Sequence, residues 1–588
     1  MFTPQTRPRS PHSLLLLPLL ALLALVLNAQ GVKAASKDEW RSRSIYQLMT
    51  DRFAPPSSTA PALTAGIPED GTAPCPAGTQ NWCGGTYRSI VDKLDYIQGM
   101  GFDAIWISPT SKNIDTMTAY GAAYHGYWIE DTTQLNPRFG DKADLLALSA
   151  ELHKRGMFLM VDIVVNHVVA NPAPTVQEMI DLNPDLLWRK VEQYHPRCPM
   201  DYGNTTSVEV CWMGDDKLPL ADVNTENVEV IQTLQTWIHD FVTEFGVDGL
   251  RIDAAKHVRP EYWQPFCASA GVFCIGEVYG SDIAEAASFQ SLNYMDSVLN
   301  FPTYYGAAAA FFNRPDAPLN MSNLVDIHSQ VQKAFPDVGL LGSFLGNHDL
   351  PRYHGLQVDP RTAWNALVWQ FMSDGIPTVF YGDEQEIGGG DLQGRGDPYN
   401  RPALWTPESG NYDVTKGTYV NIQRLNQVRK FLIATDAQRD GKTFLHNNVD
   451  FLEWNDNDLA FRKGPILVFL TNRGSPSVPA SIGVSSTGWK GSVVNILECN
   501  VYNIGSNSSI MVSWSAAGAG GKPYVFMSYD DAAATGICPN VVSYNKANST
   551  KSSTRNSRDN AADVGVVQSS IVGLALLTCA SILFSLLL

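Results

Sequence analysis

Charge is scarce in this chain of 588 residues, and positive charge is scarcer than negative charge. Only 17% of the residues are Asp, Glu, Lys or Arg, and 42 Lys and Arg stand against 59 Asp and Glu, a formal net charge of -17. No run of Lys or Arg occurs, which excludes the basic surface that binds nucleic acid or anionic lipid. The 14 Trp and 22 Tyr favour a neutral ligand such as a sugar, whose apolar faces pack on aromatic rings.

Long apolar runs are missing from the body of the chain and occur only at its two ends. Near the N-terminus, Arg7 and Arg9 precede an apolar run at 14–27 and small residues around 32–35, which is the pattern of a secretory signal peptide. We expect residues 1–34 to be removed on export through the endoplasmic reticulum. The alternative is an uncleaved N-terminal anchor, for which the apolar run is short.

The apolar tail at residues 571–588 has no charge after it. It follows Asn560, Ala561 and Ala562 and a polar spacer through Ser570, which is the layout of a glycosylphosphatidylinositol (GPI) attachment signal. We expect residues 561–588 to be exchanged for a GPI anchor and residues 541–560, rich in Ser, Thr and Asn, to form a stalk. This would hold the protein at the outer plasma membrane or cell wall; a true tail anchor is the alternative.

Cysteine is also sparse, with nine residues, of which Cys579 lies in the apolar tail. An even number remains, which in a secreted protein indicates disulfides. Near neighbours are plausible partners, but the sequence alone does not fix the pairing. The remaining cysteines are Cys75, Cys83, Cys198, Cys211, Cys267, Cys274, Cys499 and Cys538.

Eight short apolar runs alternate with longer amphipathic stretches between about residues 44 and 385. Near-continuous apolar strands separated by helices indicate a parallel sheet covered on both faces, and eight such repeats predict a (β/α)8 TIM barrel. We assign residues 35–165 and 225–435 to this barrel. The runs occupy residues 44–49, 104–109, 158–164, 249–254, 273–278, 297–302, 343–349 and 378–385.

Two further segments do not follow the barrel pattern. The connection after the third strand is too long for an ordinary loop, and connections of that length are usually functional, so residues 166–224 are predicted to form a small inserted domain. Beyond residue 435, alternating segments separated by Gly, Ser and Asn predict an antiparallel β-sandwich over residues 436–540.

Carboxylates recur where the predicted strands end, at Asp162, Asp253, Glu277 and Asp349. Barrel active sites are built from strand ends and the loops that follow them. One such residue would be explained by a helix cap or an ion pair, but four at the same edge predict a catalytic site.

Several motifs at these positions resemble the conserved segments of the α-amylase family, glycoside hydrolase family 13. Further stretches around Trp40, Cys83 and Tyr127 are similar to secreted fungal α-amylases, and the likeness extends from about Trp40 to Cys538. The four segments are DIVVNH (162–167), GLRIDAAKH (249–257), GEV (276–278) and NHD (347–349).

The resemblance implies a retaining mechanism in which Asp253 is the nucleophile and Glu277 the acid/base. Such chemistry needs two carboxyl groups about 5 Å apart, and adjacent parallel strands, about 4.8 Å apart, can supply that separation. The resemblance makes Asp349 a third carboxylate that orients the sugar. Arg251 lies two residues before Asp253, on the same side of its strand, where its charge would keep Asp253 ionised.

The resemblance also implies a set of substrate contacts. His167 and His348 would hydrogen-bond the sugar at the scissile bond, and Tyr127 would stack under its ring. Lys256 and His257 would lie on the acceptor side of that bond, and Asp397 and Arg401 on the donor side. Gln80 and Trp128 complete the predicted contacts.

A calcium ion is implied at the edge of the barrel, because hard oxygen ligands suit Ca²⁺. By resemblance, Asn166 and Asp222 would supply side-chain oxygens, and Glu209 and His257 main-chain carbonyls. The resemblance also implies the disulfides Cys198–Cys211, Cys75–Cys83 and Cys499–Cys538. It leaves a fourth bridge, between Cys267 and Cys274, open.

The expected function is that of an endo-acting α-amylase, a monomer that hydrolyses α-1,4-glucosidic bonds in starch-like α-glucans. An α-1,4-glucanotransferase that remodels cell-wall α-glucan is the alternative, because a sugar can replace water as acceptor. A catalytically inactive ectodomain, of the kind associated with transporters, is a remote third, because such proteins lose the catalytic carboxylates that are present here.

Overall fold

The computed structural model describes residues 35–56, 75, 77–312, 318–357, 359–388, 395–436, 443–474, 480–504, 507–514 and 520–541. The expected signal peptide (1–34), GPI propeptide (561–588) and all but the first residue of the stalk lie outside the described residues. Among the residues described, no helix combines the length and apolar character needed to cross a bilayer.

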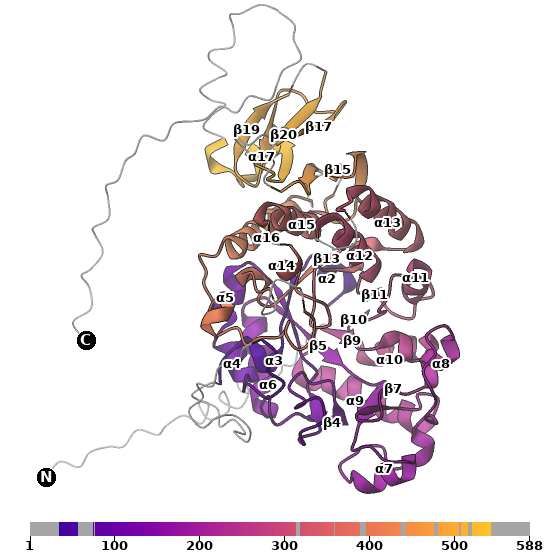
Figure 1. The fold of residues 1–588 in the computed structure, drawn as a ribbon. Helices are drawn as coiled ribbons and strands as arrows, with labels where there is room; N and C mark the ends of the chain where they lie inside the picture. Colours follow the sequence, from indigo (N-terminus) through magenta and orange to yellow (C-terminus); the bar gives the residue numbers. More distant parts are fainter. Residues whose placement is uncertain are drawn as a thin grey trace, which may run out of the picture.

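A parallel sheet of eight strands forms the centre of the molecule (Figure 1). Each strand pairs with its sequence neighbours among the eight, except β11 and β12, which form the two ends of the sheet, and β1 pairs with β13. A single bridge between Leu299 and Gly342 joins the two ends of the sheet, so the barrel closes. The predicted barrel is confirmed. Its strands are β1 (Ile45–Gln47), β2 (Ala104–Ile107), β5 (Phe158–Ile163), β9 (Gly249–Ile252), β10 (Phe273–Gly276), β11 (Ser297–Val298), β12 (Gly342–Ser343) and β13 (Ile376–Phe380).

Helices surround the barrel, and local sequence signals set their ends. The long helix α9 (Val228–Phe245) begins after Asn227, whose side chain accepts hydrogen bonds from two backbone N–H groups, and ends at Gly246 with a φ of 62°, a left-handed cap that glycine favours. The other helices of the barrel region are α2 (Lys37–Arg41), α3 (Thr50–Phe53), α4 (Tyr87–Val91), α5 (Leu94–Gly99), α6 (Lys142–Lys154), α10 (Trp263–Ala270), α11 (Ile283–Ser291), α12 (Phe301–Phe311), α13 (Met321–Ala334), α14 (Tyr353–Leu356), α15 (Pro360–Met372) and α16 (Gly417–Asp436).

The long connection after β5 forms a small subdomain beside the barrel. It holds an antiparallel sheet in the order β6, β8, β7, and the disulfide Cys198–Cys211 closes one of its loops. A separate hairpin precedes β5 and reaches the same side. The subdomain contains β6 (His167–Val169), α7 (Val176–Leu182), α8 (Thr205–Val210), β7 (Met213–Gly214) and β8 (Pro219–Asp222), and the hairpin is β3 (Ser111–Asn113) with β4 (Ile129–Leu135).

An antiparallel β domain follows the barrel and packs on its helices α13 and α15 (Figure 1). A six-stranded sheet and a separate two-stranded sheet enclose an apolar cluster around Trp514 and Phe526. The predicted C-terminal antiparallel domain is confirmed. Its elements are β14 (Asp450–Trp454), β15 (Asp458–Lys463), β16 (Ile466–Thr471), β17 (Ala480–Val484), β18 (Ser492–Asn495), β19 (Asn500–Asn503), β20 (Ile510–Trp514), β21 (Tyr524–Ser528) and α17 (Tyr529–Thr535).

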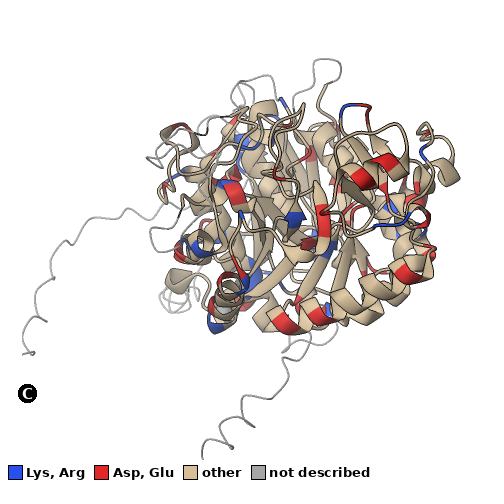
Figure 2. Ribbon diagram, turned by 90° about the horizontal axis from the view of Figure 1, so that it is seen from below, with Lys and Arg blue, Asp and Glu red and all other residues tan. Residues whose placement is uncertain are grey.

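Four disulfides brace the part of the chain that the structure describes, which confirms the expectation that the eight cysteines other than Cys579 are bonded. Three are the bridges that the family resemblance implied, Cys75–Cys83, Cys198–Cys211 and Cys499–Cys538. The fourth, Cys267–Cys274, joins α10 to β10 and answers the question that the sequence left open. Acidic and basic residues are intermixed along the ribbon (Figure 2).

Candidate active site

A pocket of about 320 Å³ opens where the barrel strands end. It gathers all but two of the predicted catalytic and substrate residues, although they come from loops far apart in the chain. The exceptions are Arg251, which lies fully buried beneath it, and Gln80, which is exposed in a loop beside Gly121. The predicted residues that line the pocket are Tyr127, Trp128, His167, Asp253, Lys256, His257, Glu277, His348, Asp349, Asp397 and Arg401.

Strand register brings the two principal carboxylates together. Ile252 of β9 pairs with Gly276 of β10, so Asp253 and Glu277 follow at adjacent strand ends. The Arg251 guanidinium lies below both, with Nη1 2.8 Å from Asp253 Oδ1 and Nη2 3.1 Å from Glu277 Oε2. One cation therefore contacts both carboxylates.

A third carboxylate, Asp162 on β5, completes this buried cluster. Its oxygens lie 2.9 and 3.1 Å from Arg251 Nη1 and accept hydrogen bonds from Tyr127 (2.8 Å) and the Trp106 indole (3.0 Å). Sequence analysis noted Asp162 as a strand-end carboxylate but gave it no role, and missed Trp106. Asp162, which lies opposite Arg251 on the neighbouring strand, therefore orients Arg251 and holds the Tyr127 hydroxyl.

Asp349 lies on the opposite wall in a second charged group. His348 Nε2 is 3.0 Å from Asp349 Oδ2, and Arg401 Nη2 is 3.2 Å from Oδ1. Arg401 also reaches Asp397 at 2.9 Å, and the Tyr127 ring stacks on His348 with 5.0 Å between ring centres. Burial would raise the pKa of Asp349, but His348 and Arg401 outweigh it and hold that pKa below its ordinary value.

Two predicted histidines are neutral in this setting. Burial lowers the pKa of His167 and of His257 to about 4. His167 Nε2 donates to the Tyr127 carbonyl (3.1 Å) and His257 Nδ1 to the Val208 carbonyl (3.1 Å). Near pH 7 both rings are therefore uncharged hydrogen-bonding groups.

The backbone after Asp253 is strained and donates a hydrogen bond to Glu277. Ala254 adopts φ 48° and ψ 37°, a left-handed conformation that costs a non-glycine residue roughly 1 kcal/mol or more. In this conformation the Ala254 N–H donates to Glu277 Oε2 at 3.0 Å. Arg251 contacts the same oxygen, so neither contact involves Glu277 Oε1.

Burial raises the pKa of Asp253 well above its ordinary value, and the adjacent Arg251 charge opposes that rise. Asp162 and Glu277 add to the rise because like charges crowd the site. The arrangement can therefore present one carboxylate, held by Arg251, together with a nearby carboxyl group. This is the pair that attack and proton transfer at a glycosidic bond require.

Other pocket residues were missed by sequence analysis. His125, Met213, Leu220 and Tyr279 line the pocket beside the predicted set. His125 lies two residues before Tyr127, in the stretch that is similar to secreted fungal α-amylases, and was open to prediction. Tyr279 follows Glu277 by two residues, but nothing in the sequence marks it as a surface of the pocket.

The oxygens predicted to bind calcium have an unusual environment. Asn166 Oδ1 and Asp222 Oδ2 are buried and have no hydrogen-bond partner, although buried polar atoms are normally paired. Backbone pairing holds these residues side by side, because the Val223 N–H donates to the Asn166 carbonyl at 2.9 Å. The contact between His257 and Val208 joins η3 (Ala255–His257) to the helix α8, which holds Glu209.

A hard cation would satisfy both orphaned oxygens, so these residues fit Ca²⁺. The described residues contain no cluster of three or more His, Cys, Asp or Glu side chains suited to a metal. The predicted ligand set instead relies on one amide (Asn166), one carboxylate (Asp222) and main-chain carbonyls.

Comparisons with known proteins agree with the geometry of the pocket. Residues 47–448 match the family described as "Alpha amylase, catalytic domain", and residues 452–546 match "Alpha-amylase, domain C". The chain is 39% identical to "Alpha-amylase mde5" of Schizosaccharomyces pombe over 489 residues, 82% of this chain and 88% of the relative. It is 38% identical to "Alpha-amylase 1" of Schwanniomyces occidentalis over 512 residues, 86% of this chain and 93% of the relative.

A solved structure is similar across the same span. The α-amylase from Malbranchea cinnamomea superposes with a TM-score of 0.74 at 38% sequence identity, covering 86% of this chain and 100% of that chain.

Proposed function

Because this chain belongs to the α-amylase family, glycoside hydrolase family 13, we propose that it hydrolyses α-1,4-glucosidic bonds within starch-like α-glucans, with retention of anomeric configuration. The observation that carries the proposal is the contact of one guanidinium, Arg251, with both Asp253 and Glu277. It keeps the two carboxyl groups close together, as a retaining mechanism requires.

In the first step, Asp253 attacks the anomeric carbon and the bond to the leaving oxygen breaks. Arg251 holds Asp253 Oδ1, which leaves Oδ2 as the attacking atom. Glu277 gives its proton to the leaving oxygen, and Oε1 is the atom suited to carry that proton because Arg251 and Ala254 both contact Oε2. The products of this step are a glycosyl-Asp253 ester and a shortened glucan.

In the second step, Glu277 takes a proton from water and the hydroxide oxygen attacks the same carbon, which releases the Asp253 carboxylate. Two displacements at one carbon restore its configuration. Asp349 and His348 lie across the pocket, where they would hydrogen-bond sugar hydroxyls, and the Tyr127 ring would stack under the sugar.

Calcium has a structural role in this proposal. Asn166 and Asp222 would hold it through side-chain oxygens, and Glu209 and His257 through main-chain carbonyls. The ion would tie the subdomain after β5 to the barrel, and no step of the reaction passes through it.

Transfer to a sugar is a second candidate reaction, favoured by Tyr279. This residue is 42% exposed, lines the pocket on the side of Glu277, and is held by Lys256, whose Nζ donates to its carbonyl at 2.7 Å. Its ring also contacts Phe301, with 4.8 Å between ring centres. A fixed aromatic ring beside the acid/base would bind an acceptor sugar in competition with water.

One set of measurements tests both reactions. Asp253→Asn and Glu277→Gln should each lower turnover of maltoheptaose by at least about 100-fold, the lower range for loss of a general acid, while oligosaccharide binding persists. A variant that keeps about a tenth of the wild-type rate contradicts these roles. Chromatography of wild-type products separates the reactions, because chains longer than maltoheptaose require transfer and shorter chains alone mean hydrolysis.

We propose the cell surface as the place of this activity. The support is the pattern at the two ends of the chain, which predicts export and GPI attachment. A phospholipase specific for phosphatidylinositol should then release the enzyme from membranes. Release of the whole enzyme into the medium without this treatment would contradict the proposal.

A further inference from the structure

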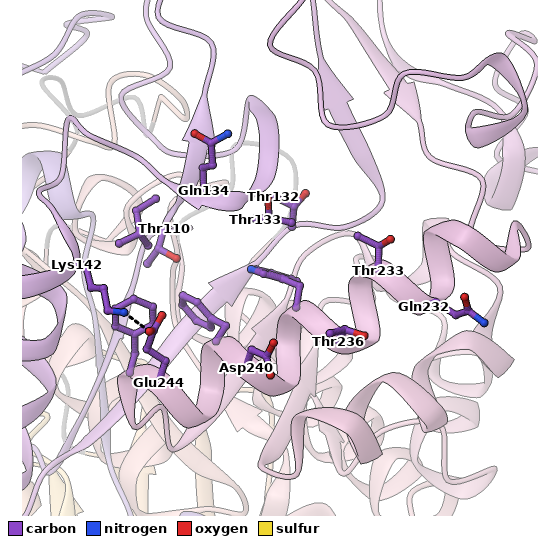
Figure 3. A pocket seen from close by; sticks show the side chains of 14 residues that line it. Thr110, Thr132, Thr133, Gln134, Lys142, Gln232, Thr233, Thr236, Asp240 and Glu244 are labelled. Carbon is purple, nitrogen blue, oxygen red and sulfur yellow. Dashed lines mark hydrogen bonds and ion pairs between the residues drawn. The ribbon is translucent and has the colours of Figure 1, made fainter.

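A second cavity, larger than the catalytic pocket, lies between β4 and the helix α9 (Figure 3). Its volume is about 860 Å³, and it shares no lining residue with the catalytic pocket. Sites for small ligands commonly measure about 300–1,000 Å³. None of the chemistry described above uses this cavity.

Aromatic rings from α9 form one wall of the cavity. Trp237, Phe241 and Phe245 recur every four residues, so they lie on one face of the helix. Their rings follow one another with 5.7 and 5.1 Å between centres. Trp237 is only partly buried, which leaves part of a large aromatic surface open to the cavity.

The rest of the lining is polar but nearly without free charge. Hydroxyl and amide groups come from both sides, including Gln134 on β4 and Thr236 on α9 (Figure 3). The Lys142 ammonium is paired with Glu244, which leaves Asp240 as the remaining charge. A phosphorylated ligand would meet a carboxylate and no free cation, and a lipid chain would leave the hydroxyl and amide groups without partners.

We propose that this cavity is an accessory binding site for a neutral α-glucan chain, separate from the catalytic pocket. Sugar rings present apolar faces to aromatic side chains and hydroxyls to polar ones, and the cavity offers both. The inference rests on the proposed function, because that function supplies the α-glucan.

The cavity lies close enough to the catalytic pocket for a glucan bound there to reach the catalytic residues. Trp128 lines the catalytic pocket and lies next to the first residue of β4, while Gln134 near the other end of β4 lines the cavity. A strand advances about 3.3 Å per residue, so six residues span about 20 Å. A polymer held in the cavity would keep its neighbouring segments near the catalytic residues and raise their local concentration.

The test measures glucan binding in enzyme that cannot turn over. In a Glu277→Gln background, Trp237→Ala should weaken retardation in glycogen-containing gels by roughly tenfold, the effect of losing one aromatic contact. Thr236→Arg should do the same by obstructing the cavity from an exposed helix position, without disturbing the aromatic wall. Thr243→Ala, on an exposed part of α9 that does not line the cavity, is the matched control.

Activity in otherwise wild-type enzyme supplies the second readout. Both cavity variants should lower kcat/KM on granular starch, and leave kcat/KM on a short chromogenic maltotrioside within about twofold of wild type, since that substrate fills only the catalytic pocket. Unchanged glycogen retardation in Thr236→Arg would overturn the accessory site, as would equal losses on both substrates. If wild type cleaves neither substrate, it is the proposed function that fails.

Discussion

At the scale of single residues, the catalytic pocket depends on how one cation is shared among three carboxylates. Arg251 is fully buried and contacts Asp162, Asp253 and Glu277 at 2.8–3.1 Å. Burial of carboxylates disfavours their charge, whereas a cation within about 4–6 Å restores it. Arg251 therefore decides how far the pKa of the nucleophile rises, and Asp162 keeps Arg251 in place.

Replacing this cation should move the pH profile. Asp253 acts as the ionised form, so kcat/KM falls as the pH drops through its pKa. Arg251→Met removes the charge that opposes the rise of this pKa, so the acid limb should shift to higher pH by about 1–3 units. Arg251→Lys keeps the charge and should shift it less. An acid limb at the wild-type pH in folded Arg251→Met enzyme would show that Arg251 does not set the pKa of Asp253.

At the scale of elements, β9 connects the packing of the barrel to its chemistry. Gly249 begins the strand, and Arg251 and Asp253 follow at alternate positions on one side. Trp40 is fully buried against this strand, its ring 5.3 Å from that of Phe158 and 5.5 Å from that of Phe273. Its indole N–H donates to the Asp248 carbonyl at 2.9 Å. The bottom of the barrel is therefore filled by a side chain that leaves no room at Gly249.

Adding one methyl group at this point should be costly. A Cβ at Gly249 would lie 2.6 Å from Trp40 Cζ2, and overpacking of this kind costs about 1–3 kcal/mol. Gly249→Ala should therefore lower the free energy of unfolding in urea by that amount. Gly203→Ala, in a loop where the nearest atom is 3.3 Å away, is the control and should change it little. Equal stability of the two variants would contradict this account of the packing.

The barrel strands were predictable because each is a compact apolar run, and the catalytic carboxylates because they follow those runs. The position of a residue along a strand says less about which side chains it contacts. Asp162 was visible as a strand-end carboxylate, but its contacts with Trp106 and Arg251 arise from neighbouring strands. The aromatic wall on α9 shows the same limit, because helical periodicity marks an apolar face without telling whether a neighbour covers all of it. The pairing of Cys267 with Cys274 likewise needed the placement of α10 against β10.

At the scale of the whole molecule, the proposed calcium ion would join the subdomain after β5 to the barrel. A ligand that binds only the folded state stabilises it, by about 2.7 kcal/mol at a hundredfold excess over its Kd. Chelation should therefore lower Tm and activity together. Asn166→Ala should lower Tm to a similar degree and make it insensitive to chelator, while Asp216→Asn at an exposed loop position should respond as wild type does. A wild-type Tm unaffected by chelator would contradict the proposed calcium site.

The barrel and the C-terminal domain are held together by a buried ionic cluster around Asp374. This residue lies between α15 and β13, and its carboxylate accepts hydrogen bonds from His328 on α13 (3.0 Å) and Gln332 (2.9 Å) and pairs with Lys463 on β15. Burial would raise the pKa of Asp374, but Lys463 and His328 outweigh it and hold that pKa well below its ordinary value. Burial also lowers the pKa of Lys463. Because several donors converge on the Asp374 carboxylate, Asp374 and Lys463 both remain charged and form an ion pair.

The depressed pKa gives this cluster a pH dependence with a definite sign. Asp374 binds its proton more weakly in the folded state than in the unfolded chain, where its pKa is about 3.9. Its contribution to stability is therefore present above about pH 4 and is lost as the pH falls through the lower folded value. Asp374→Asn leaves Lys463 buried without its counterion, which should cost about 3–5 kcal/mol at pH 7.

Calorimetry between pH 7 and pH 3 checks both parts of this prediction. The Tm of Asp374→Asn should lie below that of wild type at pH 7. The difference in Tm should narrow below about pH 4, where Asp374 takes up a proton in the unfolded chain and its charge stabilises the folded wild type less. The double variant Asp374→Asn with Lys463→Met should recover part of the loss, because it removes the unpaired buried charge. A gap that stays constant over this pH range would mean that Asp374 acts through its hydrogen bonds and not through its charge.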